Sequence, residues 1–227
     1  MWIVLVWIIS TVCYLPLYFE RIGRSVPSAL IQAKYLFVVI PIIFALMYVR
    51  RKTSIKKWLY KLFAIKIEIE AFVVCGIIAF CGILCTSIIN IKAWNEISSL
   101  LGIVYLFFMA MLEEIAWRGF CLESMMKKKR ENVAVLIVSL EWAIWHIPMW
   151  MIRNSLGIKE IALWLVYTIL VGIILGNCMI KYKNILIPII LHTMFNVCFL
   201  MPITKSIIIV LLICTGVIIL KNSKRKV

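Results

Sequence analysis

Long apolar runs, separated by short polar loops, dominate the pattern of this chain. A membrane-spanning helix needs about 20 mostly apolar residues. The pattern therefore predicts an all-α fold, a polytopic membrane helical bundle of about eight transmembrane helices. The fourth run is too long for a simple span and continues into an amphipathic end. The predicted spans are roughly 1–19, 29–49, 71–91, 97–126, 132–152, 160–180, 184–203 and 206–220.

Basic residues gather in alternate loops, at 50–66, 127–131, 181–183 and in the tail after 220. The positive-inside rule assigns such loops to the cytoplasm. We therefore expect a multi-pass protein of the cell membrane with both termini cytoplasmic. The basic, amphipathic stretch from about 50 to 70 is expected to lie along the inner membrane face. Residues 1–19 are interpreted as a retained span, because they lack the features of a cleaved signal peptide.

Composition agrees with this picture. The chain is 65% hydrophobic and only 15% charged, against about 45–50% and about 25% in soluble domains. A net charge of +15 suggests nucleic acid in a soluble protein, but the alternating loops explain it here, and we predict no nucleic-acid partner. The eight cysteines form no CxxC pair. No long linker divides the chain, so 1–227 is expected to be a single integral membrane domain.

Several ionisable residues lie inside the apolar runs. A charge at the bilayer centre costs about 2.5–3.5 kcal/mol, so such residues face a protein interior or a wet cavity and indicate function. Counted from the polar residue at the cytoplasmic end of each span, Glu113, His146 and His192 lie 14, 14 and 8 residues deep. These counts correspond to depths of about 21, 21 and 12 Å. Three helices can therefore bring these side chains together within the membrane.

Helical spacing separates the two adjacent glutamates. Glu114 and Arg118 are four residues apart and are expected to form an ion pair, which is a structural arrangement more often than a catalytic one. Glu113 is turned by about 100° from Glu114. It is left without that partner and is free for chemistry.

The same spacing groups residues on the two later helices. His192 and Asn196 share one helix face, and Trp142 and His146 share another. Each has a simpler explanation, because intramembrane His and Asn often form interhelical hydrogen bonds. Glu141 is turned away from His146 and is interpreted as structural or lumen-facing. The nine Trp residues are interpreted mostly as interface anchors and core filling.

The polar cluster suffices for hydrolysis of an amide. A carboxylate and a His can activate water as a general base, while a second His and an Asn can stabilise an oxyanion. A divalent metal such as zinc, held by Glu113, His146 and His192, is the alternative. The chain contains no HExxH, no GxSxG and no Asp. A serine nucleophile elbow and aspartyl proteolysis are therefore excluded.

Three motifs in order resemble those of the CPBP family, the CAAX proteases and bacteriocin-processing enzymes also called Abi. The segment Glu113 to Arg118 resembles the EExxxR motif, His146 ends a match to FxxxH, and His192 to Asn196 resembles HxxxN. The matched region covers 113–196, within an expected catalytic core at 97–203. One departure is visible, because Trp142 stands where the motif has Phe, which narrows the pocket.

The resemblance implies an intramembrane peptidase acting on a membrane-associated peptide or protein. It implies that Glu113 and His146 activate water and that His192 and Asn196 stabilise the oxyanion. Glu114 and Arg118 would support the helix. Two alternatives within the family are a role in lipoprotein N-acylation and a non-catalytic bacteriocin immunity protein. Membrane lipid and the substrate are the expected partners.

Overall fold

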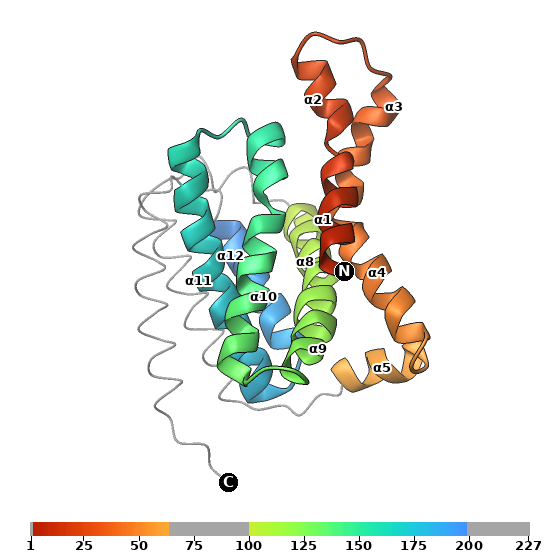
Figure 1. Ribbon diagram of the computed structural model, residues 1–227, viewed down its shortest axis with the longest axis vertical. Coiled ribbons are helices and arrows are strands. Elements are labelled where there is room, and N and C mark those ends of the chain that lie inside the picture. The colour runs from red at the N-terminus through yellow and green to blue at the C-terminus, as the bar shows by residue number, and fades with distance from the viewer. Residues whose placement is uncertain (1, 64–99, 199–227) are drawn as a thin grey trace.

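The computed structural model describes residues 2–63 and 100–198, and every regular element in these two ranges is a helix (Figure 1). The predicted all-α fold is thereby confirmed for the described part of the chain. The elements are α1 (Trp2–Val12), α2 (Leu15–Arg21), α3 (Ser28–Ile31), η1 (Gln32–Val38), α4 (Val39–Arg50), α5 (Ile55–Leu62), α8 (Leu100–Glu114), η2 (Ile115–Leu122), α9 (Glu123–Met126), α10 (Glu131–Trp145), η3 (Met149–Arg153), α11 (Ile158–Tyr182) and α12 (Leu186–Cys198).

Four stretches of the described helices are long and apolar enough to cross a membrane, namely Ile3–Arg21, Ser28–Arg50, Glu131–Arg153 and Ile158–Tyr182. They coincide with four of the predicted spans. The predicted spans 71–91 and 206–220 lie outside the described residues, as do parts of 97–126 and 184–203. The count of eight spans therefore stays a prediction.

The helices pack into a bundle around α10. In Figure 1, α10 runs beside α11, and α12 lies against both α8 and α11. Helices α1 and α4 pack together and border the other side of α8 and α10. A buried hydrogen bond of 3.0 Å from Trp145 Nε1 to Ser10 Oγ ties α10 to α1. The bundle thus surrounds the ends of α8 and α10, where the polar residues lie.

Two glycines on α11 allow the close approach of α10. An added Cβ at Gly172 would lie 2.8 Å from both Cβ and Oγ of Ser139, and one at Gly176 would lie 3.0 Å from Cγ1 of Val135. Gly172 and Gly176 form a GxxxG sequence, the small-residue pattern that lets membrane helices pack closely. The GxxxG pattern is visible in the sequence, but the sequence-based prediction did not use it.

Replacing Gly172 with alanine is expected to destabilise the protein by about 1–3 kcal/mol through overpacking against α10. Helix propensity alone predicts the opposite sign, since alanine is favoured over glycine by about 1 kcal/mol. The free energy of unfolding of the purified full chain measures the effect. The double variant Ser139→Gly/Gly172→Ala restores the space between α10 and α11. It should therefore recover part of the lost stability. A stabilised Gly172→Ala variant would contradict the packing explanation.

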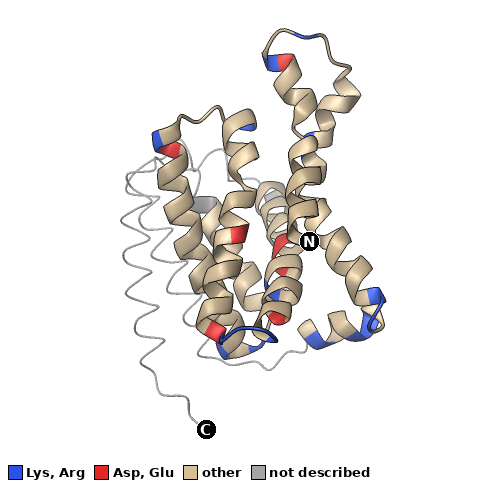
Figure 2. Ribbon diagram, viewed as in Figure 1, with Lys and Arg blue, Asp and Glu red and all other residues tan. Residues whose placement is uncertain are grey.

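Basic residues mark one end of the described helices. Figure 2 shows lysine and arginine gathered at the α4–α5 turn, along α5, in the loop after α9 and at the end of α11. Helix α5 has the expected amphipathic character, since Trp58 and Leu62 are buried while Lys56, Lys57 and Lys61 are exposed. The orientation in which this end faces the cytoplasm stays a prediction of the positive-inside rule.

Candidate active site

The two glutamates lie where the α-helix changes its hydrogen-bonding pattern. Helix α8 ends at Glu114, and the eight residues of η2 that follow form a π-helix, all of them buried. Extra residues in π-helical turns are frequent at functional sites, because they redirect side chains without ending the helix. The hydrophobic pattern of 97–126 gave no sign of this change. Arg118 belongs to this π-helix and lies in the buried interior beside Glu114.

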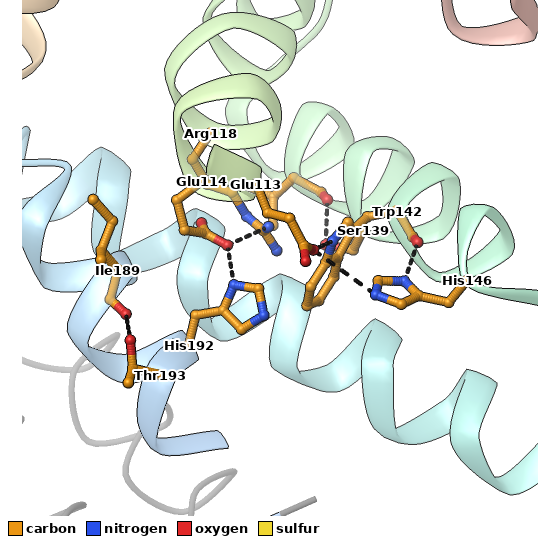
Figure 3. Close-up of polar contacts among 10 residues, drawn as sticks. Glu113, Glu114, Arg118, Ser139, Trp142, His146, Ile189, His192 and Thr193 are labelled. Atoms are coloured by element: carbon orange, nitrogen blue, oxygen red, sulfur yellow. Dashed lines mark hydrogen bonds and ion pairs between the residues drawn. The ribbon is translucent and has the colours of Figure 1, made fainter. Parts of the chain in front are cut away.

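Glu114 is the centre of a buried ionic group (Figure 3). Its Oε1 lies 2.8 Å from Nη1 of Arg118, as the spacing predicted, and 2.8 Å from Nδ1 of His192 on α12. All three residues are buried. A carboxylate only accepts hydrogen bonds, so Nδ1 of His192 is the donor. Glu114 therefore fixes the tautomer and orientation of His192 in addition to pairing with Arg118. The contact with His192 was not predicted.

Glu113 lies beside the ionic group of Glu114, Arg118 and His192, and its side chain faces α10. Its Oε2 accepts a hydrogen bond of 2.9 Å from Nε1 of Trp142 and lies 3.8 Å from Nε2 of His146. Nδ1 of His146 lies 2.8 Å from the carbonyl oxygen of Trp142, which can only accept, so this nitrogen carries a proton. In the neutral ring Nε2 is then unprotonated and presents its lone pair next to Glu113. The predicted convergence of three helices is present.

Trp142 connects the two halves of the site. Its ring centroid lies 5.1 Å from that of His146, 5.2 Å from that of His192 and 4.3 Å from the guanidinium carbon of Arg118. Both imidazoles meet the indole edge to face (Figure 3). The sequence predicted that Trp142 shares a helix face with His146 and narrows the pocket, but not that it contacts Glu113, His192 and Arg118. In fact its N–H bonds Glu113, a contact that Phe at this position cannot make.

A shell of tryptophan encloses His146. Trp145 lies edge-on to the imidazole with a centroid distance of 4.8 Å, and Trp150 stacks on it at 5.5 Å. Trp117 packs on Trp145 in turn, with centroids 5.7 Å apart, and all three indoles are fully buried. Of the two roles interpreted from the sequence, these tryptophans have that of core filling and not that of interface anchors. They restrict the rotation of His146, whose side chain is partly buried.

For the peptidase activity that the sequence resemblance implies, Trp142→Phe is expected to lower the rate about tenfold or more, because a hydrogen bond to a charged group contributes about 1.5–3 kcal/mol. The loss should fall on kcat with KM little changed, and the thermal unfolding midpoint should fall as well, because the buried carboxylate of Glu113 loses a hydrogen-bond donor. Trp7→Phe is a matched control, since Trp7 Nε1 is buried and bonds nothing in the described part of the chain. Equal rates for Trp142→Phe and the wild type would show that the hydrogen bond is dispensable.

Two further predictions for the site concern Asn196 and a bound metal ion. Asn196 lies one turn after His192 on α12 and is half-buried, and no hydrogen bond joins its side chain to another described residue. No cluster of three His, Cys, Asp or Glu side chains able to hold a metal ion occurs among residues 2–63 and 100–198. The metal alternative for Glu113, His146 and His192 stays a prediction, because a His that donates one ring N–H to a carboxylate, as His192 does to Glu114, keeps its other nitrogen for a metal.

Comparison with known proteins places these residues in context. Residues 95–198 match the family described as type II CAAX prenyl endopeptidase Rce1-like. Over 95 residues the chain is 27% identical to CAAX prenyl protease 2 of Methanococcus maripaludis, which covers 38% of this chain. The aligned part spans 35% of the length of that relative. The family match includes Glu113, His146, His192 and Asn196.

Proposed function

From the similarity of residues 95–198 to CPBP-family proteases, we propose that this chain is an intramembrane endopeptidase that hydrolyses a membrane-associated peptide or protein. The observation that carries the proposal is the pairing of Glu113 with His146. Two hydrogen-bond acceptors, Oε2 of the buried Glu113 and Nε2 of the partly buried His146, lie 3.8 Å apart. That separation is too long for a direct hydrogen bond.

A water molecule between these acceptors would donate one hydrogen to each of them. Its oxygen lone pair would then be directed away from both, toward a substrate carbonyl carbon. As the oxygen attacks, Glu113 takes the proton and acts as a general base. The hydrogen bonds from Trp142 to Glu113 and from Nδ1 of His146 to the Trp142 carbonyl hold both acceptors in place.

The tetrahedral oxyanion requires hydrogen-bond donors. We assign this role to His192 and Asn196, which share one face of α12. Nδ1 of His192 already donates to Glu114, so only Nε2 is available to the substrate. It donates only in the imidazolium form, whose charge the carboxylate of Glu114 stabilises. Breakdown of the intermediate needs a proton on the leaving amine, and the protonated Glu113 supplies it.

Hydrolysis in ¹⁸O-labelled water tests the reaction class. Membranes from cells that express the wild type, compared with cells that express Glu113→Gln, should yield new peptide C-termini that depend on Glu113. Each new terminal carboxylate formed in labelled water should carry one ¹⁸O atom, measured by mass spectrometry. Acyl transfer to an amine would leave no label at the acyl carbon. An immunity protein would give no terminus that depends on Glu113, so either of these results would exclude the proposal.

A further inference from the structure

A pocket lies at the basic end of the described helices, separate from the candidate active site. Its volume is about 930 Å³, and it opens between the end of α4 and α5 on one side and η2 with α9 on the other. None of Glu113, His146 and His192 lines it. Helix α5 is firmly docked against η2, since an added Cβ at Gly119 would lie 2.8 Å from Cδ1 of Leu62.

The charge of this pocket is positive and incompletely compensated. Five lysines line it, together with the carboxylates of Glu123 and Glu141. The carboxylate of Glu123 forms ion pairs with two of these lysines, at 3.2 Å from Lys61 and 3.7 Å from Lys127. Glu141 lies 3.6 Å from the thiol of Cys121. Lys57 and Lys128, on opposite walls, have no carboxylate partner among the described residues, so an anion between them would be favoured.

The remaining wall of the pocket is apolar and aromatic. Tyr48 and Phe120 meet edge to face with ring centroids 5.2 Å apart, and Trp58, Val49 and Met125 continue the surface. Tyr48 and Val49 belong to the last turn of the span Ser28–Arg50, so the pocket lies at the boundary between lipid and water. A small free anion would contact the lysines but would leave the apolar wall of the pocket exposed.

We infer that this pocket binds an anionic phospholipid, with the head-group phosphate between Lys57 and Lys128 and the glycerol and upper acyl chain on the aromatic wall. Basic pockets between membrane helices on the cytoplasmic side commonly bind anionic head groups. The bound lipid joins α5 to the segment that follows η2. This inference stands independently of the proposed peptidase activity.

Binding of short-chain phosphatidylglycerol to the purified full chain in detergent tests the inference, with native mass spectrometry as the measurement. The double variant Lys57→Gln/Lys128→Gln should bind about 10- to 30-fold more weakly, since each lysine near an anionic head group contributes about 1 kcal/mol. The matched control is Lys56→Gln/Lys129→Gln. It removes the same charge from the neighbouring positions of the same two segments, which do not line the pocket.

Each comparison has a decisive outcome. Phosphatidylcholine of the same chain length should bind at least tenfold more weakly than phosphatidylglycerol. Equal binding of the two lipids, or equal losses in the two double variants, would overturn the inference. Displacement of the lipid by inorganic phosphate at the same concentration would identify a free-anion site instead. Displacement by an acidic peptide would identify a peptide site, and would equally overturn it.

Discussion

Glu113→Gln is expected to lower peptide cleavage by about 10²- to 10⁴-fold, the usual contribution of a general base. The amide oxygen of glutamine can still accept the hydrogen bond from Trp142 Nε1, which in the native protein is 2.9 Å long. The side chain therefore keeps its size and position but loses its basicity. Initial rates of cleavage, measured on the substrate identified by Glu113-dependent C-termini, provide the test.

Folding must be separated from catalysis in this experiment. The thermal unfolding midpoint of Glu113→Gln should stay near that of the wild type, because no buried charge loses its partner. Glu160→Gln is the matched control, since Glu160 is exposed at the start of α11 and accepts a hydrogen bond from the Gly157 N–H that glutamine can also accept. Full cleavage activity in Glu113→Gln would remove the carboxylate from the mechanism.

Arg118→Met is expected to destabilise the protein by about 3–5 kcal/mol, because removing one partner of a buried ion pair leaves an uncompensated charge. Arg118 and Glu114 are almost completely inaccessible, and their 2.8 Å contact is the direct ionic link between them. Methionine fills a similar volume without charge, so loss of packing contributes little. The free energy of unfolding of the purified full chain, determined in a mild detergent, measures the change.

A second substitution separates the structural role of this pair from its effect on His192. The double variant Arg118→Met/Glu114→Gln removes both charges and should recover most of the lost stability, since buried ion pairs are often replaceable by neutral groups. Cleavage should not recover, because Glu114 also holds the imidazole of His192 in place through its 2.8 Å contact with Nδ1. Recovery of both properties would mean that Glu114 acts only through Arg118.

Local contacts were the part of the site that the sequence could predict. Residues four apart on one helix lie side by side whatever the rest of the fold does. The ion pair between Glu114 and Arg118 follows from that geometry, as does the contact between Trp142 and His146. The convergence of the helices was predictable from depth, since the bilayer limits where a polar side chain can find a partner.

Contacts between helices could not be derived in this way. The hydrogen bond from Trp142 to Glu113 joins residues 29 apart, and the one between His192 and Glu114 joins residues 78 apart. Both depend on the rotation of each helix about its axis, which packing decides. The π-helix Ile115–Leu122 adds to this rotation, and its hydrophobic pattern does not differ visibly from that of an α-helix.

The amino-acid pattern alone was enough to predict an all-helical membrane protein and to single out the polar residues of its interior. Its composition requires lipid as a solvent, and buried charge in lipid requires partners. Only the tertiary structure shows which partners they find on other helices. Close packing of the helices and the π-helix after α8 place Glu113 in contact with Trp142 and His146. They also place Glu114 in contact with His192. Side-chain identity sets the chemistry available, while interhelical packing sets which atoms meet.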